Sequence, residues 1–349
     1  MSNKITITTE KGEIVEAQTP IIISASRSTD IPAFYAHWFI NRLKAGYVVW
    51  YNPFNQKSMY ISFAKTKVVV FWTKNPAPMI PYLSELDKRG IHYYFQVTLN
   101  DYEKECFEPN VPPIKERIET FKHLSDIIGK ERVIWRFDPL ILTNDISPRA
   151  LLNRIWHIGN ELKGYTEKLV FSFIDIKAYR KVQNNLVKET NCFSKESIDI
   201  AEPNNLQIQE IIDGLVKLRE FWKDTGWDLT LATCAEQVDL KEYGIAHNHC
   251  IDGELMKRIF AEDKVLLFYL HTGKLPEPDI FGDIPIIPTT SIDLKDKGQR
   301  KACGCMASKD IGMYNTCKHL CVYCYANTSR KCVLDNMNKH SDNSESIIR

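Results

Sequence analysis

The sequence predicts an α/β fold, a partial TIM-type (βα)6 barrel whose mouth is covered by a cysteine-rich arm from the C-terminus. Two patterns predict it. Short β-rich runs alternate with longer amphipathic stretches from Pro20 to about Thr233, and six of the ten cysteines fall within thirty residues near the end of the chain. The length agrees, because 349 residues exceed an average domain but suit one large α/β barrel.

The strands are expected in apolar runs that are rich in β-branched and aromatic residues. Nearly continuous apolar content is typical of strands covered on both faces, as in a parallel sheet flanked by helices. The six runs are Ile21–Ala25, Val68–Trp72, His92–Val97, Arg132–Phe137, Leu169–Ile174 and Asp228–Thr233. Six βα repeats fit a partial barrel or an open doubly wound sheet, and we predict the barrel.

The segments between these runs carry the spacing of amphipathic helices. Apolar residues from Ile114 to Ile128, and again from Ile208 to Trp222, recur on one helical face. Ser147 followed by Pro148 predicts a helix start, with serine as the N-cap and proline in the first turn.

The composition changes after the last repeat, and we divide the chain into four parts. Residues 1–272 form the partial barrel, 273–302 a proline-rich arm, 303–332 a cluster-binding segment and 333–349 a polar tail. The arm has little periodicity, so we expect an extended path over the surface. The tail is polar from Asn336 onward, and we expect it to fray.

Charge and hydropathy exclude some classes of protein. Lys and Arg number 45 against 44 Asp and Glu, so no global field attracts nucleic acid or an anionic membrane. The apolar runs are shorter than the ~20 residues that cross a bilayer, and Met1 to Gly12 lacks the apolar core of a signal peptide. We therefore expect a cytoplasmic protein with no membrane partner, in which clustered cysteines bind metal rather than form disulfides.

The centre of the cysteine cluster reads Cys-x3-Cys-x2-Cys, from Cys317 through Cys321 to Cys324, with Tyr323 before the third cysteine. Three thiolates at this spacing can hold three corners of an iron–sulfur cubane and leave the fourth iron open to a small molecule. A zinc site would need a fourth ligand, such as Cys332, and unligated core cysteines are a further reading.

This motif resembles the signature of the radical S-adenosylmethionine (radical SAM) superfamily, and nearly the whole chain resembles an uncharacterised bacterial family of such proteins with a C-terminal cysteine cluster. The resemblance implies a [4Fe–4S] cluster on Cys317, Cys321 and Cys324. It also implies reductive cleavage of S-adenosylmethionine to a 5′-deoxyadenosyl radical, and a reducing electron donor such as flavodoxin or ferredoxin. It assigns no substrate.

The position of the motif departs from the superfamily pattern. The superfamily carries it after the first barrel strand, whereas the corresponding loop here, Ser24–Asp30, contains no cysteine. Since an extended chain covers roughly 3.3 Å per residue, the arm can bring the motif back to that loop. We therefore expect it near Ser24–Asp30 and Thr73–Asn75.

Four other cysteines are candidate ligands of a second [4Fe–4S] cluster: Cys234, Cys250, Cys303 and Cys305. Two alternatives remain open. The four can be buried thiols, or His247 and His249 can belong to a mononuclear metal site. Cys106 and Cys192 have no nearby partner in the sequence and are expected to be structural.

Charged and polar residues follow several of the predicted strands, where barrel enzymes assemble their sites. Arg136, Asp138 and Lys74 are the candidate catalytic residues. The resemblance implies that Arg136, Asp138 and Asp175 surround the carboxylate, ammonium and ribose of S-adenosylmethionine. Further candidate contacts to the cofactor or substrate are Tyr323, Arg27, Asp30 and Asn75. A structural Arg–Asp pair and solvated loop charges are the alternatives.

A second class of function competes with the enzyme. The cysteine segment could be a non-catalytic iron–sulfur or zinc-binding module that binds a partner or a nucleic acid, with Tyr314 and Tyr325 stacking on a single strand. The net charge gives nucleic acid no support. A metal-dependent hydrolase is disfavoured, because the predicted strand ends lack the expected sets of His and Asp ligands.

Overall fold

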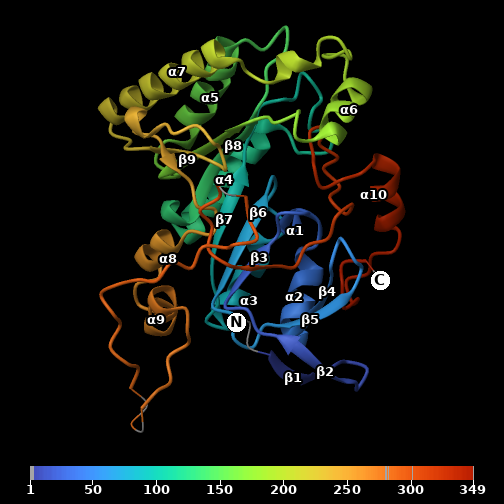
Figure 1. Ribbon diagram of the computed structural model, residues 1–349, viewed down its shortest axis with the longest axis vertical. Helices are drawn as coiled ribbons and strands as arrows, with labels where there is room; N and C mark the ends of the chain where they lie inside the picture. The colour runs from blue at the N-terminus through green and yellow to red at the C-terminus, as the bar shows by residue number, and fades with distance from the viewer. Residues whose placement is uncertain (1–3, 280, 282, 301, 349) are drawn as a thin grey trace.

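A parallel sheet of eight strands forms the centre of the computed structural model, which describes residues 4–279, 281, 283–300 and 302–348 (Figure 1). The sheet order is β11-β10-β9-β8-β7-β6-β3-β12. The strands are β3 (Ile22–Ala25), β6 (Val68–Thr73), β7 (His92–Thr98), β8 (Val133–Leu140), β9 (Lys168–Phe173), β10 (Thr230–Thr233), β11 (Ala246–His247) and β12 (Lys309–Asp310). The six predicted strands are confirmed within a few residues, and the α/β class is confirmed with them.

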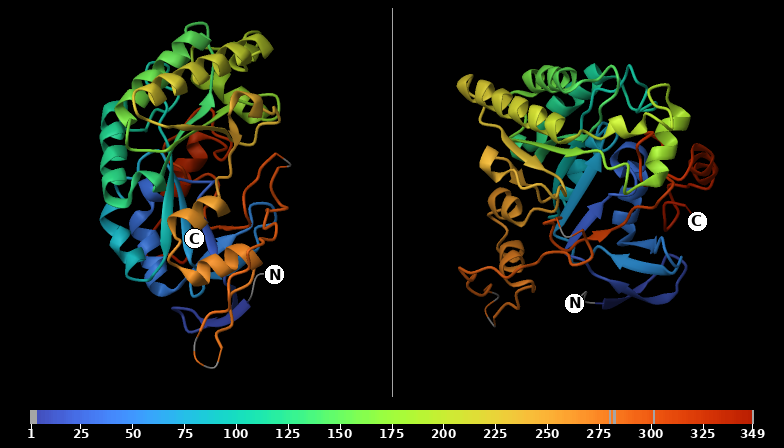
Figure 2. Two further views of the ribbon diagram at one scale, coloured as in Figure 1. Left: turned by 90° about the vertical axis from the view of Figure 1, so that its left-hand side faces the viewer. Right: turned by 45° about the horizontal axis from the view of Figure 1, so that its top comes forward.

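Helices cover one face of this sheet, shown edge-on in Figure 2. They are α1 (Ile31–Phe34), α2 (Ala36–Ala45), α3 (Leu83–Asp87), α4 (Ile114–Ile128), α5 (Pro148–Leu162), α6 (Arg180–Glu189) and α7 (Asn205–Asp224). The predicted apolar faces of α4 and α7 are buried in one large core with alternate residues of the strands. Ser147 caps α5 as expected, since its hydroxyl accepts a hydrogen bond from the backbone N–H of Ala150.

The other face of the sheet packs against α8 (Gly253–Ile259), α9 (Lys264–Thr272) and part of the cysteine segment. Tyr94, Ile134 and Val170 point to this side, because successive side chains of a strand alternate between faces. The backbone N–H of Met306 donates to the carbonyl of Ile251 at 3.0 Å. This bond joins the segment after β11 to the segment before β12, the strands at the two edges of the sheet.

A smaller sheet, which the sequence patterns did not predict, lies beside β3 in the order β1-β2-β5-β4. Its strands are β1 (Lys4–Thr8), β2 (Ile14–Gln18), β4 (Tyr47–Tyr51) and β5 (Ser58–Ser62). Short 3-10 turns lie at Ile80–Tyr82, Lys130–Arg132, Ile198–Ala201 and Lys241–Tyr243. None of the described helices is long and apolar enough to cross a membrane.

The proline-rich arm leaves α9 and turns back along the cysteine segment. The backbone N–H of Asp296 donates to the carbonyl of Cys305 at 2.8 Å, and that of Ala307 donates to Leu294 at 3.0 Å. Pairing of β12 with β3 then brings the chain to the carboxyl end of β3. Gly312 makes this approach possible, because a Cβ there would lie 1.7 Å from the hydroxyl of Ser26.

The expectation of a frayed tail is wrong. The chain forms α10 (Arg330–Met337) and then packs beside α2 and β4. The indole N–H of Trp38 donates to the carbonyl of Ser344 at 2.8 Å, and Ile347 is 1% exposed. Two adjacent isoleucines supply enough apolar surface to dock an otherwise polar segment.

The docked tail predicts a difference between two aliphatic residues of the C-terminal part. Ile347→Ala should lower the free energy of unfolding by about 2–5 kcal/mol, since it leaves a cavity in a closed site. Leu334→Ala is the matched control, because Leu334 is 50% exposed and should change little. Urea unfolding measures both, and equal small effects would mean that the tail is not docked.

Candidate metal centre at the carboxyl ends of the strands

The three-cysteine segment lies at the carboxyl ends of β3 and β6. His319, between Cys317 and Cys321, donates from Nε2 to Oδ2 of Asp30 at 2.8 Å. Asp30 follows β3, and its Oδ2 also accepts from the backbone N–H of Lys74, which follows β6, at 2.7 Å. The three-cysteine segment therefore lies at the position predicted from the sequence, near Ser24–Asp30 and Thr73–Asn75.

The backbone of this segment directs its amides at the thiols. Leu320 has φ of +56°, and this left-handed residue turns the chain between the first and second cysteines. The N–H of Ala326 donates to Cys324 Sγ at 3.3 Å. The backbone N–H groups of His319 and Asp30 lower the pKa of Cys317, and that of Asn327 lowers the pKa of Cys324. Such N–H···S bonds are a feature of iron–sulfur ligands, where they stabilise negative charge on the sulfurs.

Burial raises the pKa of all three thiols. Cys324 and Asp30 raise the pKa of Cys317 further, whereas Lys74 opposes the rise at Cys321. Thiols in these surroundings resist ionisation as long as no metal ion is present. A bound metal would remove that penalty, since its positive charge favours the thiolate form.

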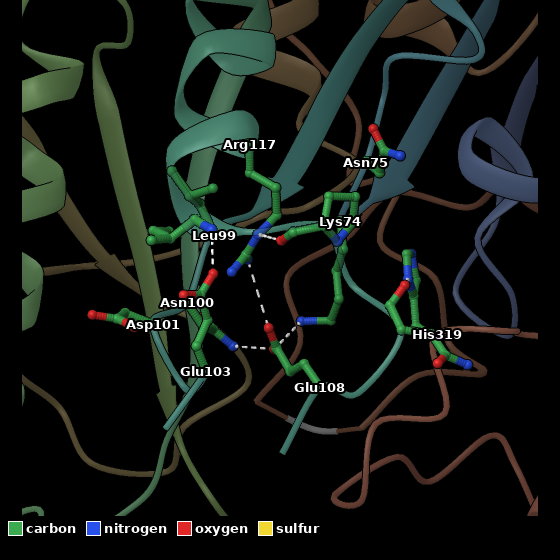
Figure 3. Close-up of polar contacts among 12 residues, drawn as sticks. Lys74, Asn75, Leu99, Asn100, Asp101, Glu103, Glu108, Arg117 and His319 are labelled. Atoms are coloured by element: carbon green, nitrogen blue, oxygen red, sulfur yellow. Dashed lines mark hydrogen bonds and ion pairs between the residues drawn. The ribbon is translucent and has the colours of Figure 1, made fainter. Parts of the chain in front are cut away.

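A buried ion-pair network lies beside Cys321 (Figure 3). Lys74 Nζ contacts Glu108 Oε1 at 2.7 Å and the hydroxyl of Tyr323 at 2.9 Å. Tyr323 also donates to Glu108. Asn100, after β7, donates from Nδ2 to the same carboxylate oxygen at 3.1 Å. The network therefore fixes Tyr323, the aromatic residue of the motif, against the ends of β6 and β7.

The charges of this network support one another. Burial alone would raise the pKa of Glu108, but Lys74 and Arg117 lower it below the usual range. Burial alone would lower the pKa of Lys74, but Glu108 and Cys321 raise it. Both groups are thus charged near neutral pH, and a cation stands next to Cys321.

The other four predicted ligands, Cys234, Cys250, Cys303 and Cys305, also come together. They form a second group of thiols on the face of the sheet that packs against α8. The sulfurs of Cys234 and Cys250 are 3.6 Å apart, and the backbone N–H of Cys250 donates to Cys305 Sγ at 3.2 Å. The pKa of Cys303 falls to about 6, mainly through the neighbouring Cys305 thiol. Cys234 follows β10, Cys250 follows β11, and the last two precede β12.

Arg136 belongs to this second group. Its Nη1 donates to Cys250 Sγ at 3.2 Å and to Gln96 Oε1 at 3.1 Å, while Nη2 pairs with Asp138. Ser172 donates to the other oxygen of Asp138, whose pKa is lowered against burial mainly by Arg136. The predicted Arg–Asp pair is therefore present, and its hydrogen-bonding capacity is largely used within the protein.

Two further residues predicted to contact the cofactor, Asp175 and Asn75, accept hydrogen bonds from nearby backbone N–H groups instead. Asp175 is exposed and accepts from the N–H of Ala178, and Asn75 accepts from the N–H of Ala77. Figure 3 shows the side chain of Asn75 pointing away from Glu108. Three other cysteines take no part in either thiol group: Cys106 is exposed, Cys192 is partly buried and Cys332 lies in α10.

A cavity of about 610 Å3 opens beside the three-cysteine segment. Its aromatic lining is Trp50, Tyr51, Tyr179, Tyr314 and Tyr325, and its charged lining includes Arg27, Arg300 and Asp310. Lys309 Nζ lies 3.3 Å from the centre of the Trp50 ring, and burial lowers the pKa of Lys309 to about 8. The small sheet thus supplies one wall of the cavity through β4.

Three polar residues that the structure places here have no role predicted from the sequence, although Glu236 is one of the charged residues that follow the predicted strands. Asn100 directly follows the third strand, so its position was a usable signal. Glu236 follows Cys234, and burial raises its pKa to about 7. Glu108 lies within a loop, where neither periodicity nor a strand end points to it. Within the described ranges, no three His, Cys, Asp or Glu side chains already have the geometry of a bound metal ion.

The fold and the thiol-rich strand ends define an α/β protein with candidate metal-binding cysteines. The chain belongs to the family described as a domain of unknown function, DUF1848, whose model matches residues 22–326. No curated protein matches the sequence.

Two solved structures show weak similarity. Dihydropyrimidinase from Brevibacillus agri has 12% identity and a TM-score of 0.25, with 63% of this chain and 48% of that chain covered. D-hydantoinase from Bacillus sp. AR9 has 13% identity and a TM-score of 0.21, with 52% and 44% covered. The chain spans about half the length of these proteins, and similarity this low carries no argument about function.

The Glu108 network predicts a pH-dependent loss of stability. Glu108→Gln should cost about 3–5 kcal/mol at pH 7, since it leaves Lys74 and Arg117 without their buried anion. The pKa of Glu108 is lower in the folded protein than the ordinary glutamate value of 4.5. The stabilisation is therefore complete above pH 4.5, and it is lost as the pH falls through the pKa of the folded state. The difference from wild type should therefore shrink in acid.

The control is Glu85→Gln. Glu85 pairs with Lys88 and Arg89 on the surface and should contribute little at any pH. Urea unfolding from pH 7 to pH 3.5 measures both variants. A Glu108→Gln effect that is as small as the control, or constant with pH, would contradict the buried charge.

Proposed function

We propose that this protein is a radical S-adenosylmethionine enzyme whose [4Fe–4S] cluster is bound by Cys317, Cys321 and Cys324. The observation that carries the proposal is the placement of this motif, on an arm that returns to the carboxyl ends of β3 and β6. The (βα)6 partial TIM-type barrel is part of this proposal, since the eight parallel strands and their helices are compatible with it. The substrate stays unassigned.

The residues present fit the cluster. The backbone N–H of Ala326 donates to Cys324 Sγ, and nearby backbone N–H groups lower the pKa of both Cys317 and Cys324, as is common around iron–sulfur ligands. The motif supplies three thiolates, and four of the other cysteines form a separate group, so one iron is left without a protein ligand. When bound, the cluster supplies one electron that cleaves S-adenosylmethionine to methionine and a 5′-deoxyadenosyl radical.

The chain's own residues would position the cofactors and exclude water. Lys74, Glu108 and Asn100 hold Tyr323 in one orientation and place a cation beside Cys321. The aromatic cavity suits the adenine ring of S-adenosylmethionine or a planar substrate, since flat rings stack on Trp and Tyr. Arg300, in the same lining, can take a carboxylate. Arg136 is engaged with Asp138 and Cys250, so we give it no role in cofactor binding.

Anaerobic reconstitution tests the proposal. Wild-type protein should be brown and bind about four irons through these three cysteines. With dithionite it should convert S-adenosylmethionine to 5′-deoxyadenosine and methionine. The triple variant Cys317→Ala, Cys321→Ala, Cys324→Ala should lose this iron and all cleavage while it stays folded, as circular dichroism can check.

Cys106→Ala with Cys192→Ala is the matched control, because both cysteines lie outside the two thiol groups and should leave iron and cleavage unchanged. Zinc instead of iron on the three cysteines would overturn the proposal. A bound cluster that neither binds nor cleaves S-adenosylmethionine would favour the non-catalytic binding module.

A further inference from the structure

We infer that Cys234, Cys250, Cys303 and Cys305 bind a single tetrahedral metal ion of the zinc type, which fastens the C-terminal segment to the sheet. This site lies outside the proposed function. It differs from the three-cysteine motif in the number of its donors, in its position and in its role. It also differs from the second [4Fe–4S] cluster expected from the sequence, because it holds one metal ion instead of four.

The spacing of the sulfurs favours one ion over a cluster. In a tetrahedral zinc site with metal–sulfur bonds of about 2.3 Å, neighbouring sulfurs lie about 3.8 Å apart. The sulfurs of Cys234 and Cys250 are 3.6 Å apart. The backbone N–H of Cys250 donates to Cys305 Sγ at 3.2 Å, which brings a third sulfur next to this pair. A cubane places its thiolates on four separate irons and holds them farther apart.

The groups around the thiols are those that a charged thiolate centre needs. Arg136 Nη1 and Asn248 Nδ2 both donate to Cys250 Sγ, at 3.2 and 3.4 Å. Arg27 lies within electrostatic reach of Cys305, Cys250 and Cys303. Its buried Nη2 has no hydrogen-bond partner in the described part of the chain. Arg136 is already paired with Asp138, whereas this nitrogen of Arg27 has no partner among the described residues. Metal-bound thiolates nearby would compensate its charge better than neutral thiols do.

Two of the four thiols are closed off from solvent, as the ligands of structural zinc sites are, while Cys234 and Cys303 are partly exposed. Cys250 is 6% exposed and Cys305 is 2% exposed. The carbonyl of Cys250 is held by Tyr94 and Gln96 of β7, at 2.6 and 3.2 Å. Gly304 packs against His249, where a Cβ would meet the ring at 2.2 Å. Only glycine between the last two cysteines allows this approach.

The four ligands come from both edges of the sheet. Cys234 and Cys250 follow β10 and β11, while Cys303 and Cys305 precede β12. Two hydrogen bonds already join the segments next to these edges, from the N–H of Met306 to the carbonyl of Ile251 and from the N–H of Cys250 to Cys305 Sγ. An ion here would close the inner face and fix the start of the chain that carries Cys317. Since the described thiols do not yet surround one point at ligand distances, binding has to draw their sulfurs inward.

Metal analysis of the triple variant Cys317→Ala, Cys321→Ala, Cys324→Ala tests this site without the first one. After growth in zinc-supplemented medium it should be colourless and hold about one zinc per chain. After removal of zinc with a chelator, Co2+ should restore one equivalent and give the intense visible bands of a tetrahedral thiolate site. Adding Cys303→Ser and Cys305→Ser should abolish both signals.

Two further variants keep the test decisive. Cys303→Ser alone changes the more exposed ligand and should weaken Co2+ binding at least tenfold. This variant tests the site if the double substitution unfolds the protein. Adding Cys106→Ser and Cys192→Ser instead should leave the metal content at one. Iron and sulfide in the triple variant would show a cluster and overturn the single ion, and absence of any metal would show buried thiols. Neither outcome depends on whether the three-cysteine site cleaves S-adenosylmethionine.

Discussion

The carboxylate of Asp30 joins three parts of the chain that are far apart in sequence. It accepts hydrogen bonds from the N–H of Ala33 at the start of α1, the N–H of Lys74 after β6 and Nε2 of His319. Asp30 is buried, and an ionised oxygen that lost a donor there would not be compensated by water. This side chain therefore ties the three-cysteine segment directly to the ends of β3 and β6, in addition to the contacts of Tyr323.

The strand β8 links the two thiol groups. The side chain of Asp138 pairs with Arg136, which donates to Cys250. The carbonyl of Asp138 accepts from Asn100, whose side chain also reaches Tyr323 of the motif. The chain thus places cations beside both groups of buried thiols, an arrangement that stabilises thiolates far more than it stabilises thiols. This shared electrostatic character supports the proposal that both groups bind metal.

The family and the fold do not identify the reaction, because one α/β architecture can carry unrelated activities. The reaction has to be inferred from the residues of the site. What distinguishes this chain is the order of its parts: the cysteine motif comes after the sheet in sequence, yet lies against the first strands in space. The small N-terminal sheet contributes to the cavity beside the motif, since Trp50 and Tyr51 of β4 form one of its walls. A C-terminal motif can therefore occupy the place of a loop that lacks cysteines.

The sequence by itself determined the elements whose signals are local. Apolar runs predicted the six main strands, helical spacing predicted α4 and α7, and Ser147 with Pro148 marked the start of α5. Spacing alone also selected Cys317, Cys321 and Cys324 as one ligand set. Only the tertiary structure decided which distant groups meet: Glu108 with Lys74 and Tyr323, Arg136 with Cys250, and Ile347 with the core. The short strands of the small sheet belong with these, since their pairing partners lie elsewhere in the chain. Such contacts depend on the path of the whole chain, and no local pattern of residues encodes them.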